Sequence, residues 1–186
     1  MGTRRSNTEV NFLYDFLILV TLSGIAFLIY KFRKKTTISS STIKMGTDII
    51  SPHPILSPHA AELYLLLIEQ GFYPETAEMI VAQAAHESGN FTSDIYRFQN
   101  NPLGMKLAVQ RRTTATGEAR GHAVYMSVKS AVEDYWLYYL ARQYPLFWLN
   151  IDTFVRALKA KGYFKADVEV YLKAVKSFYK SIFGHA

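Results

Sequence analysis

Apolar positions follow three different patterns along the chain, and the first is an unbroken run near the N-terminus. The nineteen residues from Phe12 to Tyr30 are almost all apolar, and Asp15 is the one charge among them. At about 1.5 Å per residue, a helix of this length extends ~28 Å, which matches the hydrocarbon core of a bilayer. We therefore expect an N-terminal tail at residues 1–11 and a transmembrane helix at residues 12–31.

A cleaved signal peptide is the alternative interpretation of this run. Its apolar part exceeds the roughly 7 to 15 residues that are typical of signal peptides. The basic sequence KFRKK at 31–35 follows directly, where a small-residue cleavage site would be expected. We favour an uncleaved anchor. Residues 32–57 are rich in Ser, Thr and Pro and have no helical or alternating pattern, which predicts a flexible tether.

The second pattern begins at residue 58, where apolar residues recur at the three- and four-residue spacing of amphipathic helices. The first such helix starts at Ser57-Pro58 and ends before Gly71, and the second opens at Pro74 and closes at Ser88-Gly89. The same signals predict further helices near 93–98, from Ser127 to before Pro145, from Asp152 to Gly162, and from Asp167 onward.

The third pattern occupies residues 105–126, where β-branched residues are frequent and no helical stripe is present. A turn-like Ala115-Thr116-Gly117 lies in the middle, so we expect a β-hairpin lobe that turns there. The predicted fold class is α+β. It consists of a mostly helical domain at residues 58–186 with one small β-hairpin lobe, preceded by the transmembrane helix.

Composition and charge narrow the chemistry. The chain has no cysteine, which excludes disulfides, thiolate metal sites and a cysteine nucleophile. Its 21 Lys and Arg against 15 Asp and Glu give a formal net charge of +6. Residues 1–50 hold seven of these basic and three of these acidic residues, so residues 51–186 are nearly neutral. We expect no nucleic-acid partner, because a nucleic-acid domain concentrates its basic excess on its folded part.

Glu87 is the first candidate for catalysis. It lies in the last turn of the second expected helix, where the helix dipole disfavours negative charge. The dipole and apolar neighbours such as Ala84 and Phe91 would raise its pKa, as a general acid near neutral pH requires. A solvated terminal glutamate is the alternative. His86 and Glu87 also begin a zinc-protease-like H-E-x-x-H, but Asn90 replaces the second histidine, so we expect no metal site.

Three regions resemble the signature regions of the bacterial and phage peptidoglycan N-acetylglucosaminidase family, the glycoside hydrolases of autolysins and flagellar rod proteins. They are Ala82–Lys106, Tyr125–Tyr135 and Lys161–Tyr171, in the same order and spacing. The resemblance covers residues 58–182. Its most specific elements are Glu-Ser-Gly at 87–89, Asn100-Asn101 and Leu-Gly-Met-Lys at 103–106.

The resemblance implies a lysozyme-like fold with a catalytic acid at Glu87 and no cofactor. It also implies a second carboxylate in the β lobe, for which Glu118 is the candidate, and a tyrosine at Tyr163 that lines the cleft near the reacting sugar. A solvated turn residue and a core aromatic are the respective alternatives. Residues expected to shape the cleft or bind the sugar are Asn100, Asn101 and Tyr125.

Three functions stay open at this stage. The first is a membrane-anchored peptidoglycan hydrolase that cleaves at N-acetylglucosamine. The second is a non-catalytic wall-binding or virion structural protein that retains the fold. The third is a lysozyme or lytic transglycosylase that cuts the opposite glycosidic bond. The expected partners are peptidoglycan, a lipid bilayer through residues 12–31, and virion proteins.

The expected location is a single-pass membrane protein of the bacterial envelope or of a membrane inside a phage virion. Peptidoglycan lies outside the cytoplasmic membrane, whereas the basic cluster at 31–35 would stay in the cytoplasm by the positive-inside rule. A virion membrane would resolve this conflict, and we favour it as the hypothesis for a short enzyme on a flexible tether.

Overall fold

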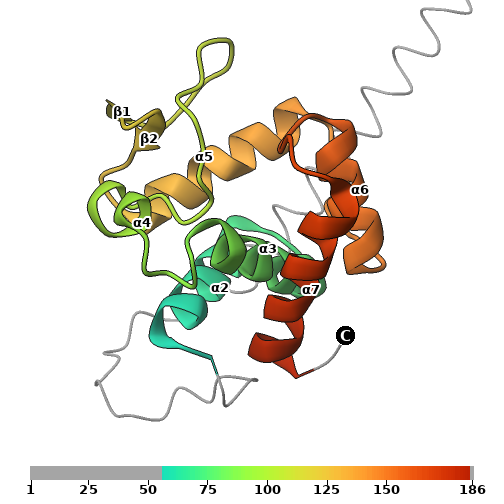
Figure 1. Cartoon of the computed structure of the whole chain (residues 1–186). Coiled ribbons are helices and arrows are strands. Elements are labelled where there is room, and N and C mark those ends of the chain that lie inside the picture. The colour runs from blue at the N-terminus through green and yellow to red at the C-terminus, as the bar shows by residue number, and fades with distance from the viewer. Residues whose placement is uncertain (1–55, 185–186) are drawn as a thin grey trace, which may run out of the picture. The chain divides into compact units, whose positions relative to one another are not determined.

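The computed structural model describes residues 56–184, which form six helices and one two-stranded antiparallel sheet (Figure 1). In chain order these elements are α2 (Pro58–Gln70), α3 (Pro74–Glu87), α4 (Asp94–Gln99), β1 (Gly117–Ala119), β2 (His122–Val124), α5 (Val128–Ala141), α6 (Ile151–Ala160) and α7 (Val168–Phe183).

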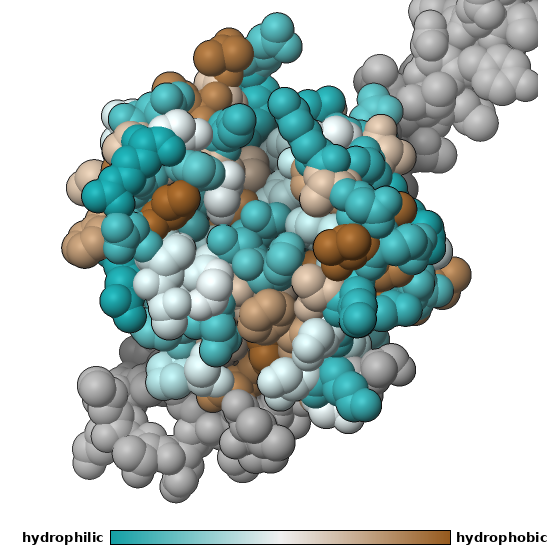
Figure 2. Space-filling view, viewed as in Figure 1, coloured by the Kyte–Doolittle hydropathy of each residue, from teal (hydrophilic) through white to brown (hydrophobic). Residues whose placement is uncertain are grey.

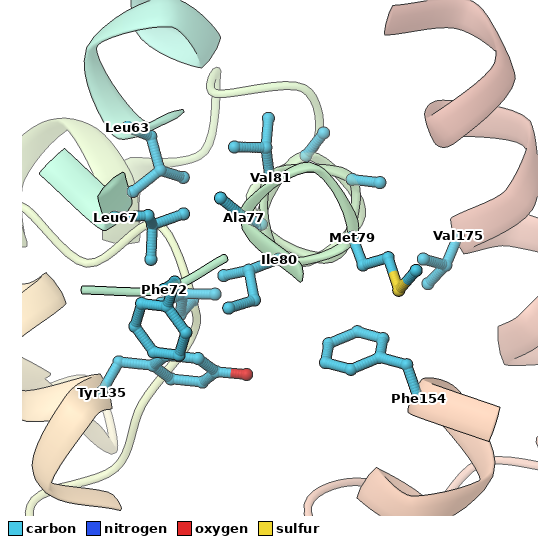
Figure 3. Close-up of a cluster of buried hydrophobic side chains, with 14 of the residues drawn as sticks. Leu63, Leu67, Phe72, Ala77, Met79, Ile80, Val81, Tyr135, Phe154 and Val175 are labelled. Carbon is cyan, nitrogen blue, oxygen red and sulfur yellow. The ribbon is translucent and has the colours of Figure 1, made fainter. Parts of the chain in front are cut away.

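Helix α3 is the centre of the core. Ten consecutive residues of this helix, Thr76–Ala85, are buried, and a helix that is buried all round rather than on one stripe must be surrounded by other elements. Figure 3 looks along α3 and shows its side chains meeting those of four other helices: Leu63 and Leu67 of α2, Tyr135 of α5, Phe154 of α6 and Val175 of α7. The position of α3 is therefore fixed from all sides up to its last turn.

The helix boundaries confirm most of the sequence signals. The Ser57 side chain accepts a hydrogen bond from the Ala60 amide at the start of α2, and Gly71 ends that helix. Ser127 caps α5 and Asp167 caps α7 in the same way. Helix α6 was expected to start at Asp152, but it starts at Ile151. Asn150 is its N-cap residue and accepts the capping hydrogen bond from the Thr153 amide.

The β-hairpin lobe is present, but its turn lies elsewhere. The strands pair Gly117 with Val124 and Ala119 with His122, which leaves Arg120 and Gly121 as the two turn residues. Both have positive φ, 54° and 75°, as a two-residue turn that follows the strand twist requires. The expected turn at 115–117 was wrong, because Gly117 pairs with Val124 in the first strand and the positive φ values lie at Arg120 and Gly121.

In Figure 1 the hairpin lies at one end of α5, and α6 lies near the other end. The loop that leads into the hairpin, the C-terminal end of α5 and the connection from α6 to α7 contribute residues to one cleft, which is described below.

The fold class expected from the sequence included a transmembrane helix, and this part of the prediction is not supported. A membrane-spanning helix needs roughly 20 apolar residues, and no helix within residues 56–184 is long and apolar enough to cross a membrane. The structure shows a mostly helical domain with one small two-stranded sheet, so a single-pass membrane location is not supported. The expected span at residues 12–31 lies outside the described residues, as do the tail and nearly all of the tether.

Candidate active site

A cleft of about 530 Å³ opens on the described part of the chain. Its walls come from the end of α3, the loop after α4, the last turn of α5 and the segment that follows α6. Residues that line it include Glu87, Leu103, Gly104, Lys106, Arg111, Tyr138, Arg142, Tyr163 and Phe164. Hydrophilic residues predominate on the face seen in Figure 2, and hydrophobic ones form small separate patches there. A concave site that combines aromatic rings with a few polar groups is typical of ligand-binding clefts.

Glu87 is the last residue of α3, and the chain turns sharply after it. The Ser88 hydroxyl donates to the Ala84 carbonyl oxygen at 2.6 Å and accepts from the Phe91 amide at 2.9 Å. Residues Gly89–Phe91 all have positive φ, between 56° and 63°. This turn ends the helix at Glu87, so its side chain extends from a rigid, buried helix into the cleft.

The environment of Glu87 favours its protonated form. Burial raises the pKa of this carboxyl above its ordinary value of 4.5. A hydrogen bond from Tyr171 and the nearby imidazoles of His86 and His122 lower the pKa, but they do not outweigh burial. A carboxyl group with a raised pKa can hold a proton at a pH where an ordinary glutamate has lost it, and so can act as a general acid.

Tyr171 of α7 orients this carboxyl. Its hydroxyl donates to Glu87 Oε1 at 2.6 Å. The Tyr171 ring stacks on Phe164 with centroids 3.7 Å apart and planes 6° apart, and the edge contact with His86 has centroids at 4.7 Å. Burial and the neighbouring Glu87 raise the pKa of the Tyr171 hydroxyl, so it stays a hydrogen-bond donor.

Tyr171 was not among the site residues expected from the sequence, although it ends one of the signature regions. It lies on the buried stripe of α7 with Leu172, Val175 and Tyr179, and a tyrosine in such a stripe is readily interpreted as core. One signal was available: a buried tyrosine hydroxyl normally needs a polar partner. Among the described residues, that partner is the carboxylate at the end of α3.

Gly104 leaves the other carboxylate oxygen accessible from the loop side. Its φ is +59°, and a Cβ placed on it would lie 3.5 Å from Glu87 Oε2. A side chain at this position would therefore be strained and would cover the oxygen that faces the loop. This explains in physical terms why a glycine stands in the Leu-Gly-Met-Lys sequence at 103–106.

Tyr163 lines the cleft, where the resemblance expects it. Its hydroxyl donates to the Leu103 carbonyl oxygen at 2.6 Å, which ties the segment after α6 to the loop that carries Gly104. Its ring makes edge contacts with Tyr135 and Tyr138 of α5. The hydroxyl thus holds the cleft together, while a role of Tyr163 in the chemistry stays a prediction.

Asn100, Asn101 and Tyr125 do not line the cleft. The Asn101 side chain is buried, donates to the carbonyl oxygens of Met105 and Ala123, and accepts from the Met105 amide. Asn100 Nδ2 donates to the Tyr125 carbonyl oxygen at 2.9 Å. These contacts tie the loop to the base of the hairpin, so the geometry favours structural roles over the expected sugar binding.

The Tyr125 hydroxyl donates to Asp134 Oδ2 at 2.7 Å, and Asp134 also forms a two-point ion pair with Arg111 at 2.7 and 2.9 Å. Burial would raise the pKa of Asp134, but hydrogen bonds from Arg111, Thr113 and Tyr125 hold it below its ordinary value. The pair thereby anchors the cleft wall that contains Arg111 to helix α5.

Glu118 lies away from the cleft. It is an exposed residue of β1, opposite Ala123, and precedes the hairpin turn instead of following it as expected. It is not among the residues that line the cleft, where Glu87 is the one carboxylate of the described residues. The prediction that Glu118 supplies a second catalytic group is not tested by its position in this structure.

Comparisons with known proteins place the chain in a family. Protein bax of Escherichia coli (strain K12) is 42% identical over 57 residues, a match that covers 31% of this chain and 21% of that protein. The chain thus matches about a fifth of the length of this curated relative. No solved structure matches the chain. Residues 69–183, more than half of the chain, match the glucosaminidase family, described as mannosyl-glycoprotein endo-β-N-acetylglucosaminidase. The chain therefore belongs to the glucosaminidase family.

Proposed function

We propose that this chain is a peptidoglycan hydrolase that cleaves the glycan strand at N-acetylglucosamine, as an endo-β-N-acetylglucosaminidase. The observation that carries the proposal is the carboxyl group of Glu87, the one carboxyl group that lines the cleft among residues 56–184: Glu87 ends a buried helix, is oriented by Tyr171 and has a raised pKa. Membership of the glucosaminidase family supports a glycoside hydrolase. The three signature regions support peptidoglycan as its substrate.

In the proposed reaction, protonated Glu87 is the general acid. It donates its proton to the glycosidic oxygen as the bond between this oxygen and the anomeric carbon of N-acetylglucosamine breaks. The ring of Tyr163 faces the same cleft and would lie beside the sugar on which positive charge develops. Tyr171 is a positioning residue, because it acts on the substrate only through the carboxyl group that it orients.

The residues that line the cleft indicate which group attacks the anomeric carbon. Because Glu87 is the one carboxylate that the described residues bring to the cleft, the attacking group is best supplied by the N-acetyl group of the substrate. Its carbonyl oxygen would bond to the anomeric carbon while the leaving oxygen takes the proton from Glu87. Water would then open the resulting ring, returning a proton to the Glu87 carboxylate. Such substrate assistance is an established variant of glycoside hydrolysis.

Product analysis tests the proposed function. The full chain is incubated with purified peptidoglycan, the new reducing ends are reduced with borohydride, and the sugars are identified by mass spectrometry. Reduced N-acetylglucosamine at the new ends supports the proposal. Reduced N-acetylmuramic acid would identify a lysozyme, a non-reducible anhydro sugar would identify a lytic transglycosylase, and binding without any new end would identify a wall-binding protein. A virion-associated role in phage entry stays a prediction.

A further inference from the structure

The charged groups of the cleft are mostly cationic. Among the residues that the structure describes, one carboxylate, Glu87, and three basic side chains line it: Lys106, Arg111 and Arg142. Arg111 is neutralised by its two-point ion pair with Asp134. Within residues 56–184, neither Lys106 nor Arg142 forms an ion pair. The cleft therefore presents two uncompensated positive charges to whatever it binds.

These two cations stand on different walls. Lys106 follows Gly104 on the loop, close in sequence to the glycine that contacts Glu87. Arg142 is the C-cap residue that follows α5, and its guanidinium lies 5.6 Å from the centroid of the Tyr138 ring, which also lines the cleft. The guanidinium of Arg142 is thus held by an aromatic face, and its N–H groups are not used in any ion pair.

A third cation lies next to Arg142. Lys161 Nζ donates to the Arg142 carbonyl oxygen at 2.5 Å, and it lies 5.5 Å from the centroid of the Tyr144 ring. The amine of Lys161 thus contacts the backbone of Arg142, although Lys161 itself is not among the residues that line the cleft. Positive charges that line a cleft without a protein carboxylate as partner favour an anionic ligand.

A neutral amino sugar offers hydroxyl and acetamide groups but no anionic group that could pair with the two cationic side chains of the cleft. Peptidoglycan differs from a neutral glycan because alternate sugars carry short peptides with free carboxylates. We propose that Lys106 and Arg142 bind carboxylates of the peptide stem beside the scissile bond, so that the site takes peptide-bearing glycan in preference to an uncharged strand. This inference rests on the proposed function and names the substrate class of the same site.

The test compares two substrates of equal shape. Glycan strands freed of phosphate polymers are used either as they are or after their carboxylates have been converted to amides. We expect the KM of the full chain to be about three- to tenfold higher on the amidated strands, the size expected for one or two exposed ion pairs, with kcat unchanged. Equal KM values on both substrates would overturn the inference.

Variants locate the effect. The double variant Lys106→Gln, Arg142→Gln should lose the preference, with a KM on native strands that equals its KM on amidated strands. The control removes two cations that lie outside the cleft and already have carboxylate partners, Lys129→Gln and Arg156→Gln. It should keep the preference. A double cleft variant that still discriminates between the substrates would refute the assignment of these two residues.

A binding measurement separates this inference from the proposed function. The Glu87→Gln variant is sedimented with native and with amidated strands, and the bound fraction is measured. Stronger binding to native strands supports the inference even if the unmodified chain cleaves neither substrate, in which case only the hydrolase proposal fails. Equal binding to both strands overturns the inference whatever the activity.

Discussion

Glu87 stands where a carboxylate is poorly stabilised, and its neighbours act on it in opposite directions. Burial raises its pKa and the Tyr171 hydrogen bond lowers it. The residue that orients the acid therefore also limits how far its pKa rises. If Glu87 reacts in its protonated form, kcat/KM falls as the pH rises through its pKa. This fall is the alkaline limb of the pH profile of kcat/KM. A substitution that raises the pKa of Glu87 should move the limb to higher pH, and one that lowers this pKa should move it to lower pH.

Tyr171→Phe removes the hydrogen bond that lowers the pKa of Glu87, so that pKa rises further. We expect the alkaline limb of the pH profile of kcat/KM to move to higher pH, and kcat at the optimum to fall several-fold because the carboxyl group loses its orienting donor. Tyr179→Phe is the matched control on the same helix, because its hydroxyl binds Glu78 instead. A limb that stays in place or moves to lower pH in Tyr171→Phe would contradict the assigned role.

Glu118→Gln tests the second carboxylate. Since Glu118 is exposed on β1 and outside the cleft lining, we expect kcat to stay within about threefold of the unmodified enzyme, far from the roughly 10²-fold loss typical of a general acid or base. The measurement is the initial rate on purified peptidoglycan. A loss of that larger size would show that Glu118 enters the reaction and would disfavour substrate assistance.

Residues differ in how much the sequence reveals about them. Glu87 could be singled out because a carboxylate in the last turn of an apolar helix is unusual and because it belongs to the most specific element of the resemblance. Tyr171 could not, because a core tyrosine and a positioning tyrosine have the same periodicity. The contacts of Asn101 could not be predicted for a related reason: an exposed amide in a turn and a buried amide with three backbone hydrogen bonds look identical until the fold is known.

At the scale of elements, one ion pair joins the cleft loop to α5. The Asp134 side chain is fully buried, and that of Arg111 is 17% exposed. Removing one member of such a pair leaves the other charge without a partner, which costs about 3–5 kcal/mol. The pair thus contributes to both the stability of the fold and the shape of the cleft wall.

Asp134→Ala should lower the free energy of unfolding by about 3–5 kcal/mol, as measured by urea denaturation. The matched control is Asp152→Ala, which breaks the ion pair with Lys176, whose members are 42% and 43% exposed. This change should cost less than about 1 kcal/mol. Equal losses in the two variants would mean that burial does not distinguish these pairs.

The same aspartate predicts a pH dependence of stability. The pKa of Asp134 is lower in the folded state than its ordinary value of 3.8. Its contribution is therefore present above that ordinary value and is lost as the pH falls through the folded-state pKa. We expect the unmodified chain to lose more stability on acidification than Asp134→Ala does. Parallel curves of unfolding free energy against pH would contradict this expectation.

Helices whose first residues carry a clear capping signal were predicted accurately, and the hairpin turn, which lacks such a signal, was not. The helices begin at Ser57, Ser127 and Asp167 as expected, because their side chains satisfy backbone amides that have no partner within the helix. The hairpin turn was misplaced because the strands have only three residues each, too few to show an alternating pattern. The positive φ values of Arg120 and Gly121 fixed the turn instead.

At the scale of the whole molecule, the core holds α3 rigidly and delivers its last residue to the cleft. A carboxylate whose folded-state pKa is raised destabilises the fold at a pH above that pKa, because the unfolded chain ionises more easily. The end of α3 adds the unfavourable interaction with the helix dipole. Glu87→Gln should therefore leave the melting temperature at pH 7 unchanged or raise it, as measured by differential scanning calorimetry.

If the proton of Glu87 drives the proposed hydrolysis, a side chain of the same shape without that proton should leave the chain nearly inactive. The rate of new reducing ends from purified peptidoglycan is compared between the unmodified chain and Glu87→Gln at equal folded concentration. Glutamine preserves the shape of the side chain and its hydrogen bond from Tyr171 but has no proton to donate. We predict a loss of at least ~10²-fold with no loss of stability. A folded Glu87→Gln variant that retains near-full activity would contradict the account.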